Sequence, residues 1–184
     1  PVPVDRALIG GLLADSRIEA FEQSPVSTSQ IQDRPEAAAI LLDIMRNDSP
    51  ATGARARAML ALFDEPALRP IGEALALPGA VWRRSLLNLL WALITTHEPR
   101  EWPGLLDLVV TDVLPLFTDE TVIPADLESG LEIEYEYRVC DEAYTTCQRL
   151  LHPDFDESLF RGLDFDERDR EIRVLQSRLA RPLP

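Results

Sequence analysis

Apolar residues recur at steps of three and four along most of this chain, the spacing that places them on one face of an α-helix. Polar stretches, prolines and glycines interrupt the pattern often enough to divide it into short segments. We therefore predict an all-α fold. The predicted helices cover residues 5–21 (as one or two short helices), 35–46, 50–63, 66–77, 80–94, 103–117, 158–163 and 166–179.

Local signals mark several of the predicted helix starts. Asp33 and Glu36 flank Pro35, an arrangement in which both acidic side chains can satisfy free backbone N–H groups of the first turn. Ser49-Pro50 and Asp64-Glu65-Pro66 combine a capping residue with a proline. Each of these sites is therefore expected to begin a helix.

The segment from Ala80 to Ile94 is the most apolar part of the chain. Asn88 is the only polar side chain between Leu86 and Ile94. A helix that is apolar on every side must be covered on every side. We expect this segment to form the central buried helix.

Residues 131–137 fit two interpretations. Their alternation of apolar and charged side chains is typical of a strand, but a stripe at helical spacing also begins here. That stripe consists of Ile133, Tyr137, Cys140, Tyr144, Cys147 and Leu151. An isolated strand is only marginally stable, and no partner strand is evident, so we predict a helix. Residues 119–129, which contain Pro124, are expected to form the longest loop.

One helical hairpin resembles a HEAT repeat. Its first helix carries Leu68-Arg69-Pro70-Ile71, it turns at Leu77-Pro78-Gly79, and its second helix begins Val81-Trp82-Arg83-Arg84-Ser85-Leu86-Leu87. HEAT repeats often have a Leu-Pro-x-Leu kink in the first helix and a Val-Arg run in the second, and Leu114-Pro115-Leu116 resembles the same kink one unit later. The Asp that the family places before the second helix is missing, because Pro78, Gly79 and Ala80 stand there.

The resemblance is good over residues 66–94 and partial over 35–63 and 103–118. It implies stacked antiparallel helical hairpins that form a short α-solenoid of HEAT or armadillo type. An irregular helical bundle is the alternative. The length of 184 residues suits one domain, so we expect a single α-helical domain over residues 1–184.

The charge balance restricts the possible partners. The chain has 18 basic residues, all of them arginines, against 32 acidic ones, which gives a formal net charge of −14. Nucleic acids and anionic membranes are poor partners for such a chain, because binding them requires basic side chains that neutralise phosphates. A basic protein partner fits the charge, although an acidic surface can also serve solubility alone.

Candidate catalytic and cofactor-binding chemistry is sparse. We find no metal-binding spacing, no Gly-rich phosphate loop and no nucleophile elbow, so we predict no enzymatic activity and no cofactor. His97 and His152 are expected at helix C-termini. Cys140 and Cys147 would lie about 10 Å apart on one helix, too far for a disulfide, and are expected to pack in the core. With no disulfide framework, no secretion signal and no membrane span, a cytoplasmic location is expected.

The most distinctive charged feature is the acidic segment, residues 119–136, which contains no basic residue. Its candidate partner-binding residues are Asp119, Glu120, Asp126, Glu128, Glu132, Glu134, Tyr135 and Glu136. Acidic side chains around an aromatic anchor suit a surface that recognises an Arg- or Lys-rich protein. The alternative is a solvated loop followed by a negatively charged helix start.

Another feature is the motif Asp-Phe-Asp-Glu, which occurs at residues 154–157 and again at 164–167. In each copy we expect an N-cap preceded by a hydrophobic residue.

Taken together, these features predict a non-catalytic protein-interaction module. A bacterial immunity protein or antitoxin that covers a basic toxin fits this description, and so does a scaffold subunit. The alternative function is a nucleic-acid enzyme similar to the HEAT-like DNA glycosylases. It would require a local basic face, for which Arg55, Arg57, Arg83 and Arg84 are the candidates.

Overall fold

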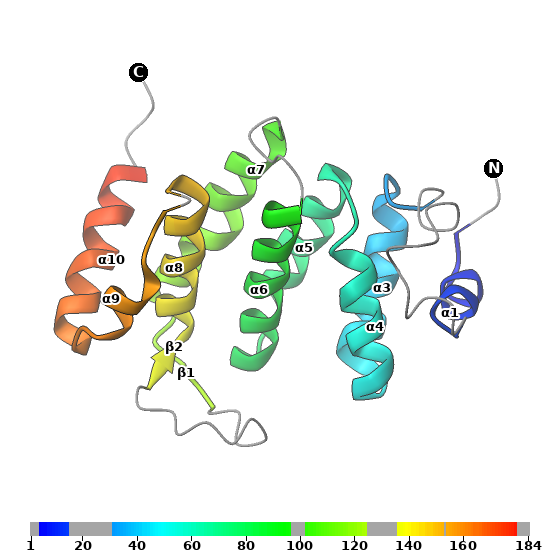
Figure 1. The fold of residues 1–184 in the computed structure, drawn as a ribbon, viewed down its shortest axis with the longest axis horizontal. Coiled ribbons are helices and arrows are strands. Elements are labelled where there is room, and N and C mark those ends of the chain that lie inside the picture. The colour runs from blue at the N-terminus through cyan, green and yellow to red at the C-terminus, as the bar shows by residue number, and fades with distance from the viewer. Residues whose placement is uncertain (1–3, 15–30, 97–101, 125–135, 153, 180–184) are drawn as a thin grey trace. The chain divides into compact units, whose positions relative to one another are not determined.

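The computed structural model describes residues 4–14, 31–96, 102–124, 136–152 and 154–179, and within them the chain is mostly helical (Figure 1). The all-α prediction is therefore confirmed. The α-helices are α1 (Arg6–Ala14), α3 (Pro35–Asn47), α4 (Pro50–Leu60), α5 (Leu68–Leu75), α6 (Ala80–Thr96), α7 (Pro103–Leu108), α8 (Val139–Leu151), α9 (Glu157–Arg161) and α10 (Phe165–Leu179). Among the described helices, none combines the length and apolar character needed to span a bilayer.

Shorter elements complete the described chain. A 3₁₀ turn, η2 (Glu65–Ala67), precedes α5, and α7 continues into a π-helical turn, η4 (Val109–Val113), and a 3₁₀ segment, η5 (Leu114–Thr118). Pro115 lies at the start of η5, so the expected departure from regular helix near this proline is present. Two short strands, β1 (Val122–Ile123) and β2 (Tyr137–Arg138), pair antiparallel.

The chain divides into two compact units. The first contains residues 1–74 and 92–105, and the second contains residues 75–91 and 106–184. We describe each unit by itself, and the single domain over residues 1–184 remains a prediction.

In the first unit, α3 and α4 form a closely packed pair with α1 beside them. Gly53 of α4 lies against α3, where a Cβ atom would meet the Met45 carbonyl oxygen at 3.1 Å. Ile9, Leu41 and Met59 are fully buried. Arg6 of α1 pairs with Asp43 and Asp48, so an exposed ionic contact joins α1 to the end of α3.

The helix starts of this unit follow the local signals only in part. Ser49 caps α4, because its hydroxyl accepts a hydrogen bond from the Thr52 backbone N–H at 3.3 Å. At α3 the predicted N-cap is wrong, because the N-cap residue is Arg34, which makes no side-chain capping bond. The Glu36 carboxylate accepts hydrogen bonds from its own backbone N–H and from Arg34, and both lower its pKa. Pro35 at the first position lacks an N–H, so this start has one donor fewer to satisfy.

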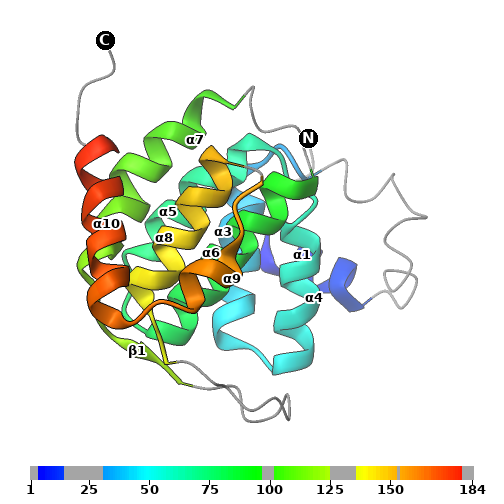
Figure 2. The same cartoon turned by 60° about the vertical axis from the view of Figure 1, so that its left-hand side comes forward.

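In the second unit, α8 is the most enclosed helix, and α10 and η5 pack against it. Figure 2 shows α8, α9 and α10 side by side. The predicted helix over 80–94 is confirmed as α6, and Leu86, Leu87, Leu89 and Leu90 are fully buried. Every residue of α8 from Val139 to Cys147 is buried, although several are polar.

The prediction of a helix from Ile133 through Tyr137 is wrong at Tyr137. Tyr137 lies in β2, and α8 begins only at Val139; residues 131–135 fall outside the described part of the chain. The partner strand that the sequence did not reveal is Val122–Ile123, within the expected loop. Pairing with this strand gives the backbone of β2 the hydrogen bonds that a helix would otherwise provide.

The two Asp-Phe-Asp-Glu motifs both cap helices but use different aspartates. Asp156 caps α9 by accepting from the Ser158 backbone N–H at 2.9 Å. At α10 the cap is Asp164, which accepts from the Glu167 N–H, while the Glu167 carboxylate accepts from the Asp164 N–H. Phe155 precedes the first cap as predicted, whereas Phe165 follows the second.

Candidate functional site

The structure describes both ends of the acidic segment and shows how they are held. Of the candidate partner-binding residues, Asp119, Glu120 and Glu136 lie in the described chain, whereas Asp126, Glu128, Glu132, Glu134 and Tyr135 lie outside it. Beyond the strand pairing, the Val139 N–H donates to the Thr121 carbonyl at 3.0 Å and the Cys140 N–H to the Asp119 carbonyl at 2.9 Å. The two ends of the segment are therefore fixed beside each other at the start of α8.

Asp119 makes an ion pair with Arg83 of α6. Burial alone would raise the pKa of Asp119, but hydrogen bonds from Thr121 and the Arg83 guanidinium outweigh it and hold the pKa below its usual value. Arg83 also donates through Nε to the Leu75 carbonyl at 3.2 Å. The Asp119 carboxylate is thus occupied within the chain, whereas Glu120 and Glu136 are exposed.

A cavity of about 440 Å³ lies beside this ion pair. It is lined by Leu75, Ala76, Arg83, Thr111, Asp112, Pro115, Leu116, Thr118 and Asp119. Two of these residues, Thr111 and Asp112, belong to the π-helical turn η4, an irregularity often found at functional sites. The cavity therefore adjoins the point at which the acidic segment leaves the helical body of this unit.

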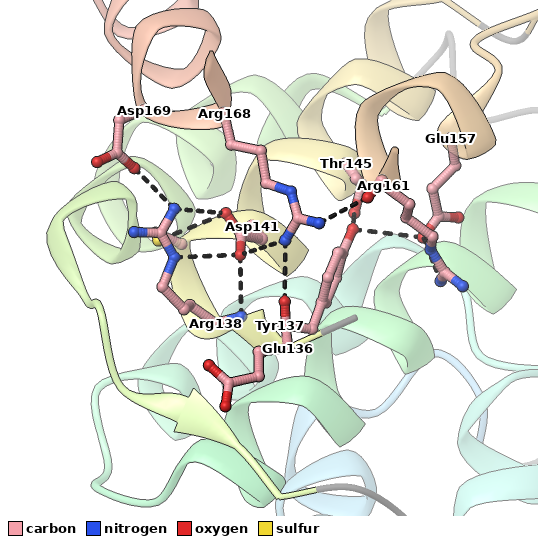
Figure 3. Close-up of polar contacts among 10 residues, drawn as sticks. Glu136, Tyr137, Arg138, Asp141, Thr145, Glu157, Arg161, Arg168 and Asp169 are labelled. Carbon is pink, nitrogen blue, oxygen red and sulfur yellow. Dashed lines mark hydrogen bonds and ion pairs between the residues drawn. The ribbon is translucent and has the colours of Figure 1, made fainter. Parts of the chain in front are cut away.

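The other end of the segment rests on a buried ionic cluster of Arg138, Asp141, Arg168 and Asp169 (Figure 3). Arg138 donates to the Asp141 Oδ1 at 2.9 Å and to the Asp169 Oδ1 at 2.7 Å. Burial would lower the pKa of Arg138, but its bonds to Asp141 and Asp169 outweigh burial and raise it. The Arg138 guanidinium therefore stays charged.

Arg168 connects this cluster to the end of the acidic segment and to α9. Its Nη1 donates to the Glu136 carbonyl at 2.9 Å, and its Nη2 donates to the Arg161 carbonyl at 2.6 Å. The guanidinium also lies 5.5 Å from the centre of the Phe165 ring. Glu136, the last residue of the acidic segment, is thus held through its backbone by a side chain that is 2% exposed.

Beside the cluster, Glu157 of α9 collects several donors. Arg149 and Arg161 form ion pairs with its carboxylate. The Tyr137 hydroxyl lies 3.4 Å from Glu157 Oε1 and 3.4 Å from Thr145 Oγ1 (Figure 3). Burial raises the pKa of Tyr137 to about 12, so its phenol is protonated at neutral pH. These contacts fasten β2 to α8 and α9.

The cysteines are buried and unpaired, as predicted from the apolar stripe. Burial raises the pKa of Cys140 and that of Cys147 to about 12. A thiol acts as a nucleophile only as thiolate, so neither residue is activated. His152 lies at the C-terminal end of α8 as expected, and His97 is outside the described residues. Within the described chain, no group of His, Cys, Asp and Glu side chains has the geometry of a metal site.

Two of the arginines considered for nucleic-acid binding make contacts inside the chain. Arg55 donates to the Leu13 carbonyl at 3.1 Å, and Arg83 pairs with Asp119. Arg57 is exposed and Arg84 is half-buried.

Sequence reasoning found the acidic segment but missed the ionic cluster beneath it. The Arg138-x-x-Asp141 spacing is a local signal, since the Arg138 backbone N–H also donates to Asp141 at 3.0 Å. Arg168 carries no such signal, because α10 brings it to the cluster from a distant part of the sequence.

Comparison with known proteins gives no significant match to a protein-family model, to a curated protein or to a solved structure.

Proposed function

We propose that this chain is a non-catalytic protein-interaction module that binds a basic protein through its acidic segment. The observation that carries the proposal is the anchoring of both ends of that segment, by the β1–β2 pair and the Arg168 contact to Glu136. Anchoring reduces the entropy that a loop loses when it binds, and the acidic side chains speed encounter with a basic surface.

The residues of the segment take different roles in this proposal. Asp119, already paired with Arg83, positions the segment rather than contacting the partner. Glu120 and Glu136 are exposed beside the anchored strands. We assign partner contact to these two and to Asp126, Glu128, Glu132, Glu134 and Tyr135.

For the architecture, we propose stacked helical hairpins of HEAT type. The close pairing of α3 with α4 and the irregular segment at Pro115 support this. For the biological role, we propose a bacterial immunity protein or antitoxin that covers a basic toxin, or a scaffold subunit with a basic partner. The net charge of −14 supports a basic partner in both cases.

The test compares two variants that lose the same charge. In the first, Asp126, Glu128, Glu132, Glu134 and Glu136 are changed to Asn or Gln. In the control, the same is done to five exposed acids elsewhere: Glu73, Asp107, Asp154, Asp166 and Glu171. Both variants and the unchanged chain are used to capture partners from the native host, and the affinity for the captured protein is measured at several salt concentrations.

We expect the segment variant to bind at least about tenfold more weakly and with a smaller salt dependence, while the control stays close to the unchanged chain. Equal affinity for both variants would refute the role of the segment. Binding of duplex DNA at low salt, lost on changing Arg57 and Arg84 to Ala, would favour the nucleic-acid alternative instead.

A further inference from the structure

Helix α10 has a basic exposed face on a protein that is acidic overall. We call it the α10 face, and its members are Arg170, Arg173, Val174, Ser177 and Arg178, all of them exposed. At about 100° per residue these five positions fall on one side of the helix, and the buried residues Ile172 and Leu175 fall on the opposite side. A hollow of about 400 Å³ lies among the five side chains.

The three arginines of the α10 face are unpaired within the described chain. Arginines elsewhere pair with carboxylates, as Arg69 does with Glu73 one turn along α5. Over the residues that the structure describes, the side chains of Arg170, Arg173 and Arg178 make neither a hydrogen bond nor an ion pair. The protein has 32 acidic residues against 18 arginines, so a shortage of carboxylates does not explain this.

These charges are unfavourable together unless an anion balances them. Arg170 and Arg173 are three positions apart, a spacing at which like charges on a helix repel each other. The helix dipole favours a cation in the last turn, which accounts for Arg178 but not for Arg170, more than two turns before the helix ends. The Ser177 hydroxyl donates to the Arg173 carbonyl at 2.8 Å, so the guanidinium groups are the donors available to an anion.

The surroundings of the α10 face restrict the class of anion. Arg170 and Arg178 are about 12 Å apart along the helix axis, and the exposed acids Asp166 and Glu171 adjoin the face. A nucleic acid or an anionic membrane would extend its charge over these acids and be repelled, whereas a protein segment can be acidic over a short stretch. Val174, which is 41% exposed, also offers an apolar contact that a peptide side chain can cover.

We propose that the α10 face binds a short acidic segment of a partner protein. Carboxylates of the segment accept from Arg170, Arg173 and Arg178, because a guanidinium can donate two parallel N–H bonds to one carboxylate. An apolar side chain of the segment covers Val174. None of these residues belongs to the acidic segment of this chain, so the proposal does not depend on the function proposed above.

The probe is acetyl-Glu-Glu-Leu-Glu-Glu-amide, which in extended form covers about 16 Å. Its binding to the full chain is followed by ¹H–¹³C NMR of the Val174 methyl groups. At about 20 mM sodium chloride we expect saturation with a Kd of the order of 1 mM, and binding at least about fivefold weaker at about 200 mM. The peptide with glutamine in place of each glutamate should cause no saturable shift. Glycine in place of the leucine should weaken binding about threefold.

Two double variants that lose the same charge locate the site. Arg173→Gln with Arg178→Gln should weaken binding at least about tenfold. Arg57→Gln with Arg69→Gln, at exposed positions on α4 and α5, should change the affinity less than about twofold. Because all four side chains are exposed, both variants should keep the circular dichroism spectrum of the unchanged chain.

Several results would overturn the proposal. They are absence of saturation up to about 20 mM peptide, equal binding of the glutamine peptide, and equal weakening by the two double variants. Tighter binding of a short DNA duplex or of phosphatidylserine vesicles, abolished by Arg173→Gln with Arg178→Gln, would show that the face serves phosphates instead. Self-association at low salt that the same variant abolishes would show that it serves a second copy of the chain.

Discussion

At the scale of single residues, Asp141 balances the charge of two buried arginines. Its carboxylate is fully buried and accepts from Arg138 at 2.9 Å and from Arg168 at 3.4 Å. Isolated buried charges are costly, because burial strips them of water without supplying an opposite charge. The stability of the second unit therefore depends strongly on the Asp141 carboxylate.

We expect Asp141→Asn to lower the free energy of unfolding by about 3–5 kcal/mol, because the arginines lose their opposite charge and stay buried. Urea denaturation at neutral pH measures the change. The control is Asp169→Asn, whose side chain is 31% exposed and whose loss should cost clearly less. A loss below about 1 kcal/mol for Asp141→Asn would show that solvent reaches the cluster.

Glu142 presents the opposite case, a buried carboxyl whose ionised form is disfavoured. Burial raises the pKa of Glu142 from its usual 4.5, despite the charges of Arg84, Arg161 and Arg149. We expect Glu142→Gln to raise the free energy of unfolding by about 1 kcal/mol at pH 7, since the amide has no charge to bury.

The sign of this effect depends on pH. Because the pKa is raised in the folded state, the contribution of Glu142 is fully present below 4.5 and is lost as the pH rises through its folded pKa. The advantage of the Gln variant should therefore shrink as the pH is lowered toward 4.5. Glu73→Gln, at an exposed position, should show no such trend in denaturation measured across this range. A difference in free energy of unfolding between Glu142→Gln and the unchanged chain that stays constant with pH would contradict the raised pKa of Glu142.

At the scale of elements, substitution of two helical glycines by alanine tests how closely the helices pack. Among the described residues, no atom lies within 4 Å of the position that a Cβ atom would take at Gly10 in α1, whereas a Cβ atom at Gly53 in α4 would meet the Met45 carbonyl oxygen at 3.1 Å. Alanine favours a helix over glycine by about 1 kcal/mol. Gly10→Ala should therefore raise the melting temperature, while Gly53→Ala should lower it by pushing α4 away from α3. Thermal unfolding measures the melting temperatures of both variants. A higher melting temperature for Gly53→Ala would mean that α3 shifts at little cost to make room for the added Cβ atom.

The elements that the sequence predicted are those set by neighbouring residues. Ser49 and Asp156 cap helices with groups a few residues away, so their positions can be predicted from spacing alone. Strand β2 escaped prediction because its partner β1 lies across the acidic segment, and a pairing between distant residues leaves no local period. The role of Arg168 was not predicted for the same reason, because its partners Glu136 and Asp141 are distant from it in the sequence.

At the scale of the whole molecule, the net charge of −14 opposes compaction, because like charges come closer together in the folded state. Dissolved salt screens this repulsion over about 10 Å at 0.1 M. Raising sodium chloride from about 10 to 150 mM should therefore increase the melting temperature, by roughly 2–4 °C per kcal/mol gained. Scans in potassium chloride at equal ionic strength control for specific ion effects. A fall in melting temperature would show that the surface ion pairs outweigh the repulsion.

The two buried thiols of α8 allow opening of the second unit to be measured by alkylation. Cys140 is 2% exposed and Cys147 is fully buried, so an alkylating reagent reaches them only in molecules whose second unit has opened. After a brief pulse of such a reagent, the fraction of protein with the added mass of the alkyl group gives the fraction of opened molecules, without a dye or an engineered label. A partner that binds and stabilises the folded second unit should therefore slow the alkylation of these thiols, whether or not its contact surface is known.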